Sequence, residues 1–201
     1  ELIFSYASGN LGEAKNLFTS MYLYLNSVAA NKASVFDNIL AKDFGETKGI
    51  GLKKLKFSDC IKNSSSADKK SVKPINPLAN VVGELGSINW KSIYKGFKEF
   101  SIPVNDNDAL KLIKMDPGTS VPLHSHNGKE YILVLEGSFS DEYGEYNMGD
   151  IQINDQKIKH NPTSCKNHGC ICLSITENDV VFFGKFGSIF NLFTFFKSFF
   201  K

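Results

Sequence analysis

Arginine is absent from this chain: all 23 basic residues among its 201 residues are lysines, and 21 acidic residues leave a formal net charge of only +2. A guanidinium group forms the paired hydrogen bonds by which proteins read phosphates and guanine edges, and lysine does not reproduce that geometry. A net charge of +2 is also too small to attract a polyanion by electrostatics alone. We therefore expect no direct binding of nucleic acid.

A disulfide framework and a membrane span are missing as well. The four cysteines, Cys60, Cys165, Cys170 and Cys172, show no scaffold spacing, which favours reduced thiols and a cytoplasmic location. No apolar run reaches the roughly 20 residues that a membrane-spanning helix needs, and the chain shows no signal-peptide pattern. The phenylalanine-rich segment 186–200 is too short to span. We expect it to pack on the protein body; contact with a membrane surface or a partner is the alternative.

The first 62 residues have a helical pattern and form the first predicted domain. A short apolar stretch, Leu2 to Ala7, is followed by Ser8-Gly9-Asn10, a typical helix stop. Apolar residues then recur at helical intervals from Gly12 to Asn31, and a third helix is expected from Ser34, as its N-cap, to Gly45. A fourth short helix is expected at 58–62. Such helices make a thin core, and a module of this kind often completes its burial against another protein.

A polar segment separates these helices from a region rich in strands. Residues 63–71 are polar and uncapped, and Pro74 and Pro77 follow, so we assign 63–80 to a linker. Beyond it, short apolar runs are separated by Gly, Pro, Asn and Asp, which is typical of an antiparallel barrel or sandwich spanning 81–201. The expected fold class is therefore α+β. The expected strands are 92–100, 109–115, 131–135 (bounded by Gly137), 151–153 and 170–175.

Three of the chain's four histidines and one glutamate have a spacing suited to a metal centre. His124 and His126 are two residues apart and therefore face the same side of a strand. The turn signal Asn127-Gly128 allows Glu130 to face the same point from the paired strand, and His160 follows another strand. Three imidazoles and one carboxylate suit Zn²⁺, Fe²⁺, Mn²⁺, Ni²⁺ or Cu²⁺. The alternative is four buried groups satisfied by ordinary hydrogen bonds, which is costly without an ion.

Cys170 and Cys172 are two residues apart on a predicted strand, so both thiols share one face. If that face is the barrel interior, the thiols can lie near the metal and respond to oxidation, with His168 as a neighbour. The simpler interpretation, which we favour, is that small buried cysteines fill a strand. Cys60 and Cys165 belong to no such cluster.

Two motifs carry a resemblance to a known superfamily. The first is Gly118-x5-His124-x-His126-x3-Glu130-x6-Gly137 and the second is Gly149-x10-His160. Both resemble the motifs of the cupin superfamily, whose fold is a double-stranded β-helix barrel, and the first matches at every defined position. The second has Asp155 where cupins usually carry Pro and Lys157 in place of a common Gly, a difference that concerns the loop rather than the ligand. The resemblance implies a cupin barrel that binds one divalent metal ion.

A closer resemblance covers nearly the whole chain. It is carried by Leu133-Val-Leu-Glu-Gly-Ser-Phe-Ser-Asp-Glu142, Gly149-Asp-Ile-Gln-Ile-Asn-Asp-Gln156, Cys170-Ile-Cys-Leu173, Tyr6-Ala-Ser-Gly9 and the segment from Leu11 to Leu25. These residues resemble the ChrR family of bacterial anti-sigma factors, which have a C-terminal cupin. The resemblance implies that the N-terminal helices bind an extracytoplasmic-function (ECF) sigma factor and that the cupin senses oxidative stress. It makes zinc the first choice of metal, with Fe²⁺, Mn²⁺ or Ni²⁺ as alternatives.

The helical domain departs from this family at a second zinc site. Many members hold that zinc through a His and a His-x3-Cys-x2-Cys motif. This chain has Tyr22, Asn26 and Ala29 at the three motif positions, and the family's first His would precede Glu1. None of the three side chains is a good zinc ligand. We therefore predict no second zinc in the helical domain, and an apolar helix face can bind a sigma factor without it.

Three functions fit these observations. The leading hypothesis is a ChrR-type negative regulator of transcription, whose helices mask an ECF sigma factor until the cupin senses an oxidant or a small ligand. No recognisable general base accompanies the predicted ligands, which favours this non-enzymatic role. The alternative is a cupin metalloenzyme of the dioxygenase type, and the third is a storage-type cupin that only binds a small molecule. Bound zinc favours the sensor, and Fe²⁺ with oxygen consumption favours the enzyme.

Overall fold

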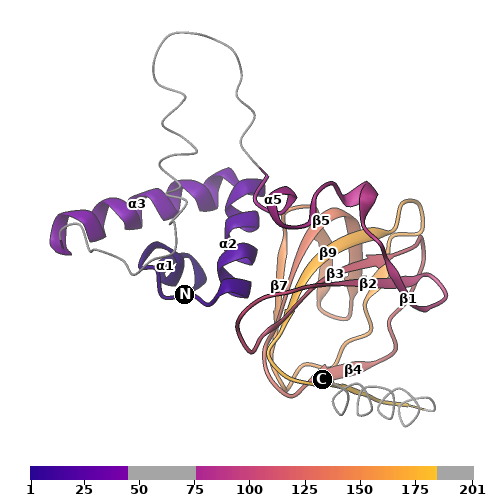
Figure 1. Cartoon of the computed structure of the whole chain (residues 1–201). Helices are drawn as coiled ribbons and strands as arrows, with labels where there is room; N and C mark the ends of the chain where they lie inside the picture. The colour runs from indigo at the N-terminus through magenta and orange to yellow at the C-terminus, as the bar shows by residue number, and fades with distance from the viewer. Residues whose placement is uncertain (45–75, 185–201) are drawn as a thin grey trace. The chain divides into compact units, whose positions relative to one another are not determined.

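The computed structural model of the chain describes residues 1–44 and 76–184. The chain divides into two compact units, Glu1–Gly86 and Ser87–Lys201, called here the helical unit and the barrel unit (Figure 1). The helix expected at 58–62, most of the expected linker, Cys60 and the phenylalanine-rich segment lie outside the described residues. Within the described ranges, no helix is both long enough and apolar enough to cross a membrane.

Three helices open the helical unit: α1 (Leu2–Ala7), α2 (Glu13–Leu25) and α3 (Ser27–Phe44). The chain turns away after α1 at Gly9, whose φ of 74° lies in the left-handed region that glycine reaches without strain. The three helices share a small apolar cluster, which has only one large aliphatic side chain among its fully buried members and is therefore thin. Its buried residues are Leu23, Ala29 and Ala33, and the partly buried Ile3, Tyr6 and Tyr22 pack against them.

The single helix predicted from Gly12 to Asn31 is wrong, because the chain breaks at Asn26. This residue is extended, with φ −126° and ψ 99°, and ends α2. Its side-chain Oδ1 accepts a hydrogen bond from the Ala29 N–H at 3.0 Å, so the same residue caps the start of α3. Ser34, predicted as an N-cap, consequently lies inside α3.

The rest of the described chain is mostly strand. A short helix, α5 (Ala79–Val82), and a 3-10 turn, η2 (Leu85–Ser87), precede the first strand. The strands in chain order are β1 (Lys91–Tyr94), β2 (Phe97–Ile102), β3 (Ala109–Met115), β4 (His124–His126), β5 (Glu130–Asp141), β6 (Gly144–Asn147), β7 (Ile151–Asn154), β8 (Thr163–Ser164), β9 (Cys170–Thr176) and β10 (Val180–Phe182).

Two glycines explain where the strands differ from those predicted. The segment 92–100, predicted as one strand, is the hairpin of β1 and β2, which turns at Gly96 with φ 83°. Gly137 does not end the buried strand as predicted. It has a φ of 71°, and β5 continues through it to Asp141. A side chain there would collide with the carbonyl oxygen of Gly169, so only glycine lets β5 bend at this point.

All strand pairs are antiparallel, in the order β1-β2-β3-β9-β5, and β9 lies between β3 and β5 (Figure 1). The first half of β5 also pairs with β7, and its second half pairs with β6 and β8. A second sheet joins β4 to β10, and a backbone bridge links His124 to His160. The predicted α+β class, with helices followed by an antiparallel β-structure, is confirmed.

Side chains on alternate positions of β5 point to the barrel core. Ile132 and Val134 belong to a buried cluster with Met115, Phe139, Cys170 and Cys172. Glu130 lies on the same face as Ile132 because it is two residues away on the same strand. The start of β5 therefore carries a carboxylate into the interior, at the end of an otherwise apolar core.

Candidate metal centre

The structure brings together the four side chains that the sequence singles out. His124 and His126 lie on β4, Glu130 begins β5, and His160 is held opposite His124 by two backbone hydrogen bonds of 3.0 and 3.1 Å. All four residues are at most 5% exposed. Each offers one ligand atom, and these atoms lie within 4.8 Å of one another. Among the described residues this is the only group of its kind.

Three of the separations between facing atoms suit a single ion. His160 Nε2 lies 3.0 Å from His124 Nε2 and 3.6 Å from Glu130 Oε2. His126 Nε2 lies 3.0 Å from Glu130 Oε2. Ligands about 2.0–2.1 Å from a tetrahedral zinc ion are about 3.3 Å apart, so the observed values bracket that spacing.

The ring of His126 is a buried polar group without hydrogen-bond partners. It is 1% exposed, and neither Nδ1 nor Nε2 makes a hydrogen bond of acceptable geometry to the described residues. Leaving a buried polar atom unsatisfied costs about 1–3 kcal/mol. A cation bound at Nε2 would remove this cost at one of the two nitrogens, so the residues present fit a divalent metal ion.

The protonation states also suit metal binding. Burial lowers the pKa of His124 to about 4, an effect that Glu130 opposes and that His160 and His126 reinforce. For Glu130, burial acts to raise the pKa, but the close contact with His126 and its charge, with the charges of His124 and His160, bring the net pKa below its usual value. At neutral pH the site therefore offers a neutral imidazole and a carboxylate, the forms that bind metals.

Three polar contacts around the four residues were not found from the sequence. His124 Nδ1 donates to the Pro122 carbonyl oxygen at 2.9 Å, and Asn154 Nδ2 donates to Glu130 Oε2 at 3.1 Å. His160 Nδ1 lies 3.0 Å from Asp141 Oδ2. Nδ1–H donation from His124 and His160 leaves the Nε2 lone pairs facing the centre. The only sequence signal was the alternation of polar and apolar residues around Asn154.

The thiols of Cys170 and Cys172 lie in the barrel interior, 4.0 Å apart. The pKa of Cys172 is raised by its hydrogen bond to Cys170, by burial, and by the charges of Cys170 and Glu130. Cys172 is therefore a protonated thiol at neutral pH, and a poor nucleophile. His168, expected near the thiols, places its Nε2 3.3 Å from Ser138 Oγ.

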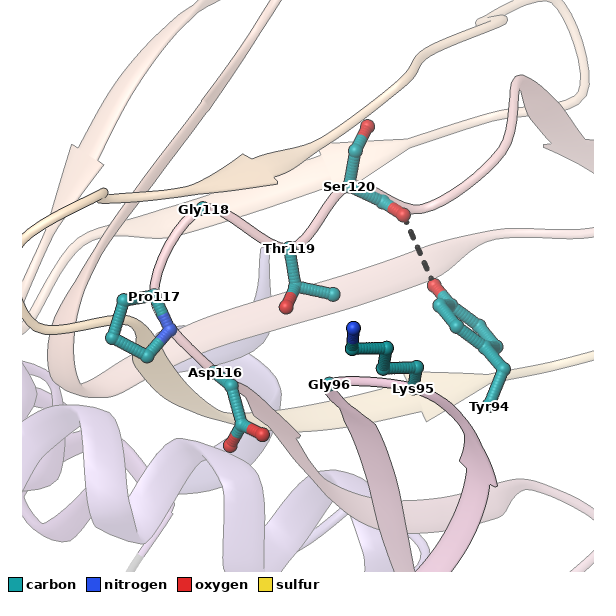
Figure 2. Close-up of a pocket in the computed structure, with 8 residues that line it drawn as sticks. All are labelled: Tyr94, Lys95, Gly96, Asp116, Pro117, Gly118, Thr119 and Ser120. Carbon is teal, nitrogen blue, oxygen red and sulfur yellow. Dashed lines mark hydrogen bonds between the residues drawn. The ribbon is translucent and has the colours of Figure 1, made fainter.

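A hollow on the barrel unit lies away from these residues. Its lining comes from the β1–β2 turn, Tyr94 to Gly96, and from the loop after β3, Asp116 to Ser120 (Figure 2). Tyr94 donates its hydroxyl hydrogen to the carbonyl oxygen of Ser120 at 3.2 Å, which closes one side. None of the four candidate ligands lines this hollow, so it is separate from the candidate metal centre.

Comparison with known proteins gives consistent matches over both units. The model of the ChrR cupin-like domain matches residues 79–178. The anti-sigma-E factor ChrR of Cereibacter sphaeroides is 29% identical over 184 residues, which cover 88% of this chain and 86% of that protein. The crystal structure of Rhodobacter sphaeroides SigE in complex with the anti-sigma ChrR matches with 31% identity and a TM-score of 0.70, covering 87% of this chain and 94% of the other.

These matches confirm the cupin barrel predicted from the two motifs. They are with an anti-sigma factor, and so they decide against the dioxygenase-like enzyme that the four-residue ligand set alone left open. The shared sequence extends through the helices as well as the barrel. The chain belongs to the ChrR family of anti-sigma factors.

Proposed function

We propose that this chain is a cytoplasmic anti-sigma factor that binds an ECF sigma factor through its helical unit. In this proposal the barrel unit holds one divalent metal ion and regulates that binding. The observation that carries the proposal is the match to ChrR in its complex with SigE, at 31% identity over 87% of this chain. A match restricted to the barrel would support only a cupin of some kind.

The helical unit has an exposed apolar face of the kind that a protein partner covers. Val28 and Val35, on α3, are 64% and 55% exposed, and their separation of seven residues places them on one side of the helix. Phe4 of α1 is 50% exposed and contacts Phe36 of α3 edge-on, with ring centroids 5.7 Å apart. We base sigma binding on these three exposed side chains, Phe4, Val28 and Val35, and call them the apolar helix face.

The helical unit is proposed to keep its shape without a metal ion. The three positions of the missing zinc motif each have a structural role instead. Tyr22 packs against the apolar cluster, Ala29 is buried within it, and Asn26 caps α3. Apolar contacts and a helix cap thus take the place of a zinc ion between α2 and α3.

In the barrel unit, His124, His126, Glu130 and His160 would hold the metal ion, with zinc as the first choice. The ion would supply a positive charge and fix the relative positions of β4, β5 and the segment before β8. The ligands come from separate segments, so their release would loosen the barrel at that end. A regulator of this type needs a coupling of about 1–3 kcal/mol between the barrel state and sigma binding.

Oxidants are the proposed signal. Burial and the raised pKa of Cys172 still favour a packing role for Cys170 and Cys172, so their oxidation is the second route by which an oxidant could act. Oxidation to a disulfide breaks both S–H bonds, forms one S–S bond and passes two electrons and two protons to the oxidant, and it would require the sulfurs to move from 4.0 Å to about 2.05 Å apart. Both residues lie on β9, which is hydrogen-bonded between β3 and β5. Such a change would therefore disturb the centre of the sheet next to the strand that carries Glu130.

Co-purification tests this function. The full-length chain is co-expressed with the ECF sigma factor encoded beside it, and we expect a stable complex. Val28→Asp should abolish the complex, because it places a charge on the apolar helix face. Asn16→Asp is the matched control, since Asn16 is exposed on α2, outside the apolar helix face, and receives the same charge. Absence of a complex with the unmodified chain, or equal loss in both variants, would contradict the proposal.

A further inference from the structure

Asp141 is a buried carboxylate outside the set of four candidate ligands. Its side chain is 0% exposed, although it ends β5 at a hairpin turn. Oδ1 accepts hydrogen bonds from the backbone N–H groups of Tyr143 and Gly144, at 2.9 and 3.2 Å. Oδ2 lies 3.0 Å from His160 Nδ1 and accepts a hydrogen bond of 2.6 Å from Gln152 Nε2. Three of the four partners are N–H donors, and with Asp141 as a carboxylate the His160 Nδ1–H donates as the fourth.

The contact with His160 determines which ring nitrogen faces the candidate metal centre. Donation from Nδ1 to Asp141 requires the hydrogen on Nδ1 and leaves a lone pair on Nε2. That Nε2 is the atom 3.0 Å from His124 Nε2 and 3.6 Å from Glu130 Oε2. Without an acceptor at Nδ1, the ring could place its hydrogen on Nε2 and lose its ability to bind a cation there.

Two side chains on one face of strand β7 donate hydrogen bonds to the carboxylates of Asp141 and Glu130. Gln152 and Asn154 are two residues apart, and they are 4% and 2% exposed. Gln152 donates to Asp141, and Asn154 donates to Glu130 at 3.1 Å. Gln152 Oε1 has no hydrogen-bond partner among the described residues, so burying this side chain carries a cost that its contact with Asp141 offsets.

We propose that Asp141, held by Gln152, is a positioning residue of the metal centre. It fixes the tautomer and orientation of His160, and its charge adds to that of Glu130 so that two carboxylates balance one divalent ion. This inference rests on the metal centre of the proposed function, and it does not depend on sigma binding.

Metal titration of the full-length chain tests the proposal. Zinc affinity is measured by competition with a chelator, and the visible spectrum of bound Co²⁺ reports ligand geometry. Asp141→Asn should weaken zinc binding by about 10–100-fold and alter the Co²⁺ spectrum, as loss of such outer partners typically does. Asp150→Asn is the matched control: the exposed Asp150 also accepts a backbone N–H in a turn, from Asn147 at 2.8 Å, but contacts no candidate ligand. The zinc affinity of Asp150→Asn should stay within about threefold of that of the unmodified chain.

A second variant covers the case in which Asp141→Asn does not fold. Gln152→Met keeps the size of the side chain and removes the donor to Asp141, and it should weaken zinc binding by up to about tenfold with a shifted Co²⁺ spectrum. If Asp141→Asn folds and its zinc affinity and Co²⁺ spectrum are unchanged, the proposal is overturned. If Asp141→Asn does not fold, unchanged affinity and spectrum in Gln152→Met overturn it. If the unmodified chain binds no metal, the metal centre and this inference both fail, whereas sigma co-purification would be unaffected.

Discussion

The helical unit and the barrel unit differ in what holds their segments together. Each has only a small apolar core, so each needs further contacts to fix its helices or strands. In the helical unit, the positions of a family zinc motif are occupied by Tyr22, Asn26 and Ala29, which pack or cap. In the barrel unit, three imidazoles and a carboxylate are buried together, and the ring of His126 lacks hydrogen-bond partners among the described residues. We therefore propose that the barrel unit holds a metal ion and that the described part of the helical unit, residues 1–44, does not.

Removal of one candidate ligand should have the largest effect. His126→Ala should reduce the metal content of the desalted full-length chain from one ion to none, because His126 supplies a buried nitrogen that makes no hydrogen bond to the described residues. Elemental analysis measures the content. His168→Ala is the control, as the His168 ring contacts Ser138 and not the cluster. Metal retained by His126→Ala would break the assignment of the barrel as the metal-binding unit.

A strong chelator should act on one unit only. Hydrogen exchange of the full-length chain, with and without chelator, should show faster exchange in β4 and the start of β5, where His126 and Glu130 would lose the ion. Peptides from α2 and α3 should exchange at the same rate in both conditions, because their contacts involve no metal in this account. Faster exchange in the helices would show that the two units do not differ as proposed.

The metal-free barrel should lose stability as the pH decreases. The unfolded chain protonates His124 near pH 6.5, whereas burial lowers the folded-state pKa to about 4. Between these values the unfolded state binds more protons, so the free energy of unfolding falls on acidification, by at most about 3 kcal/mol from this group. Urea unfolding of the chelated protein at several pH values measures this fall in the free energy of unfolding. His124→Gln should make the stability depend less on pH. A stability that rises on acidification would contradict the prediction.

The helix cap at Asn26 should give the smallest effect. Asn26→Ala should lower the free energy of unfolding by about 1 kcal/mol, because the Ala29 N–H loses its acceptor. Asn31→Ala, on the exposed side of α3, should change stability little or raise it slightly. The difference between the two variants should be the same with and without chelator, since the cap belongs to the helical unit, which we propose holds no metal ion.

The candidate ligands could be found from the sequence because their geometry is mostly local. Alternation along a strand and one turn signal suffice to place His124, His126 and Glu130 on one side. His160 came from its spacing after another strand. The residues that support them could not be found in this way. The contact of Asp141 with His160 and that of Asn154 with Glu130 depend on how distant strands pair, which spacing does not encode.

The fold class was also predictable, but several element boundaries were not, and two of them show why. The break at Asn26 lies inside a continuous helical pattern, and it exists because the asparagine side chain competes for a backbone N–H. Gly137 has the signal of a strand end, yet β5 continues through it because the Gly169 carbonyl oxygen approaches too closely for any side chain. In both cases a tertiary contact or a cap overrides the local pattern.

The most direct test counts metal ions in the complex with the sigma factor. The full-length chain is co-purified with that sigma factor, and zinc and the other divalent metals are measured per chain. This account predicts a one-to-one complex with one ion per chain. Two ions per chain would place a second metal in the helical unit, no ion would remove the barrel centre, and failure to form the complex would contradict the proposed function.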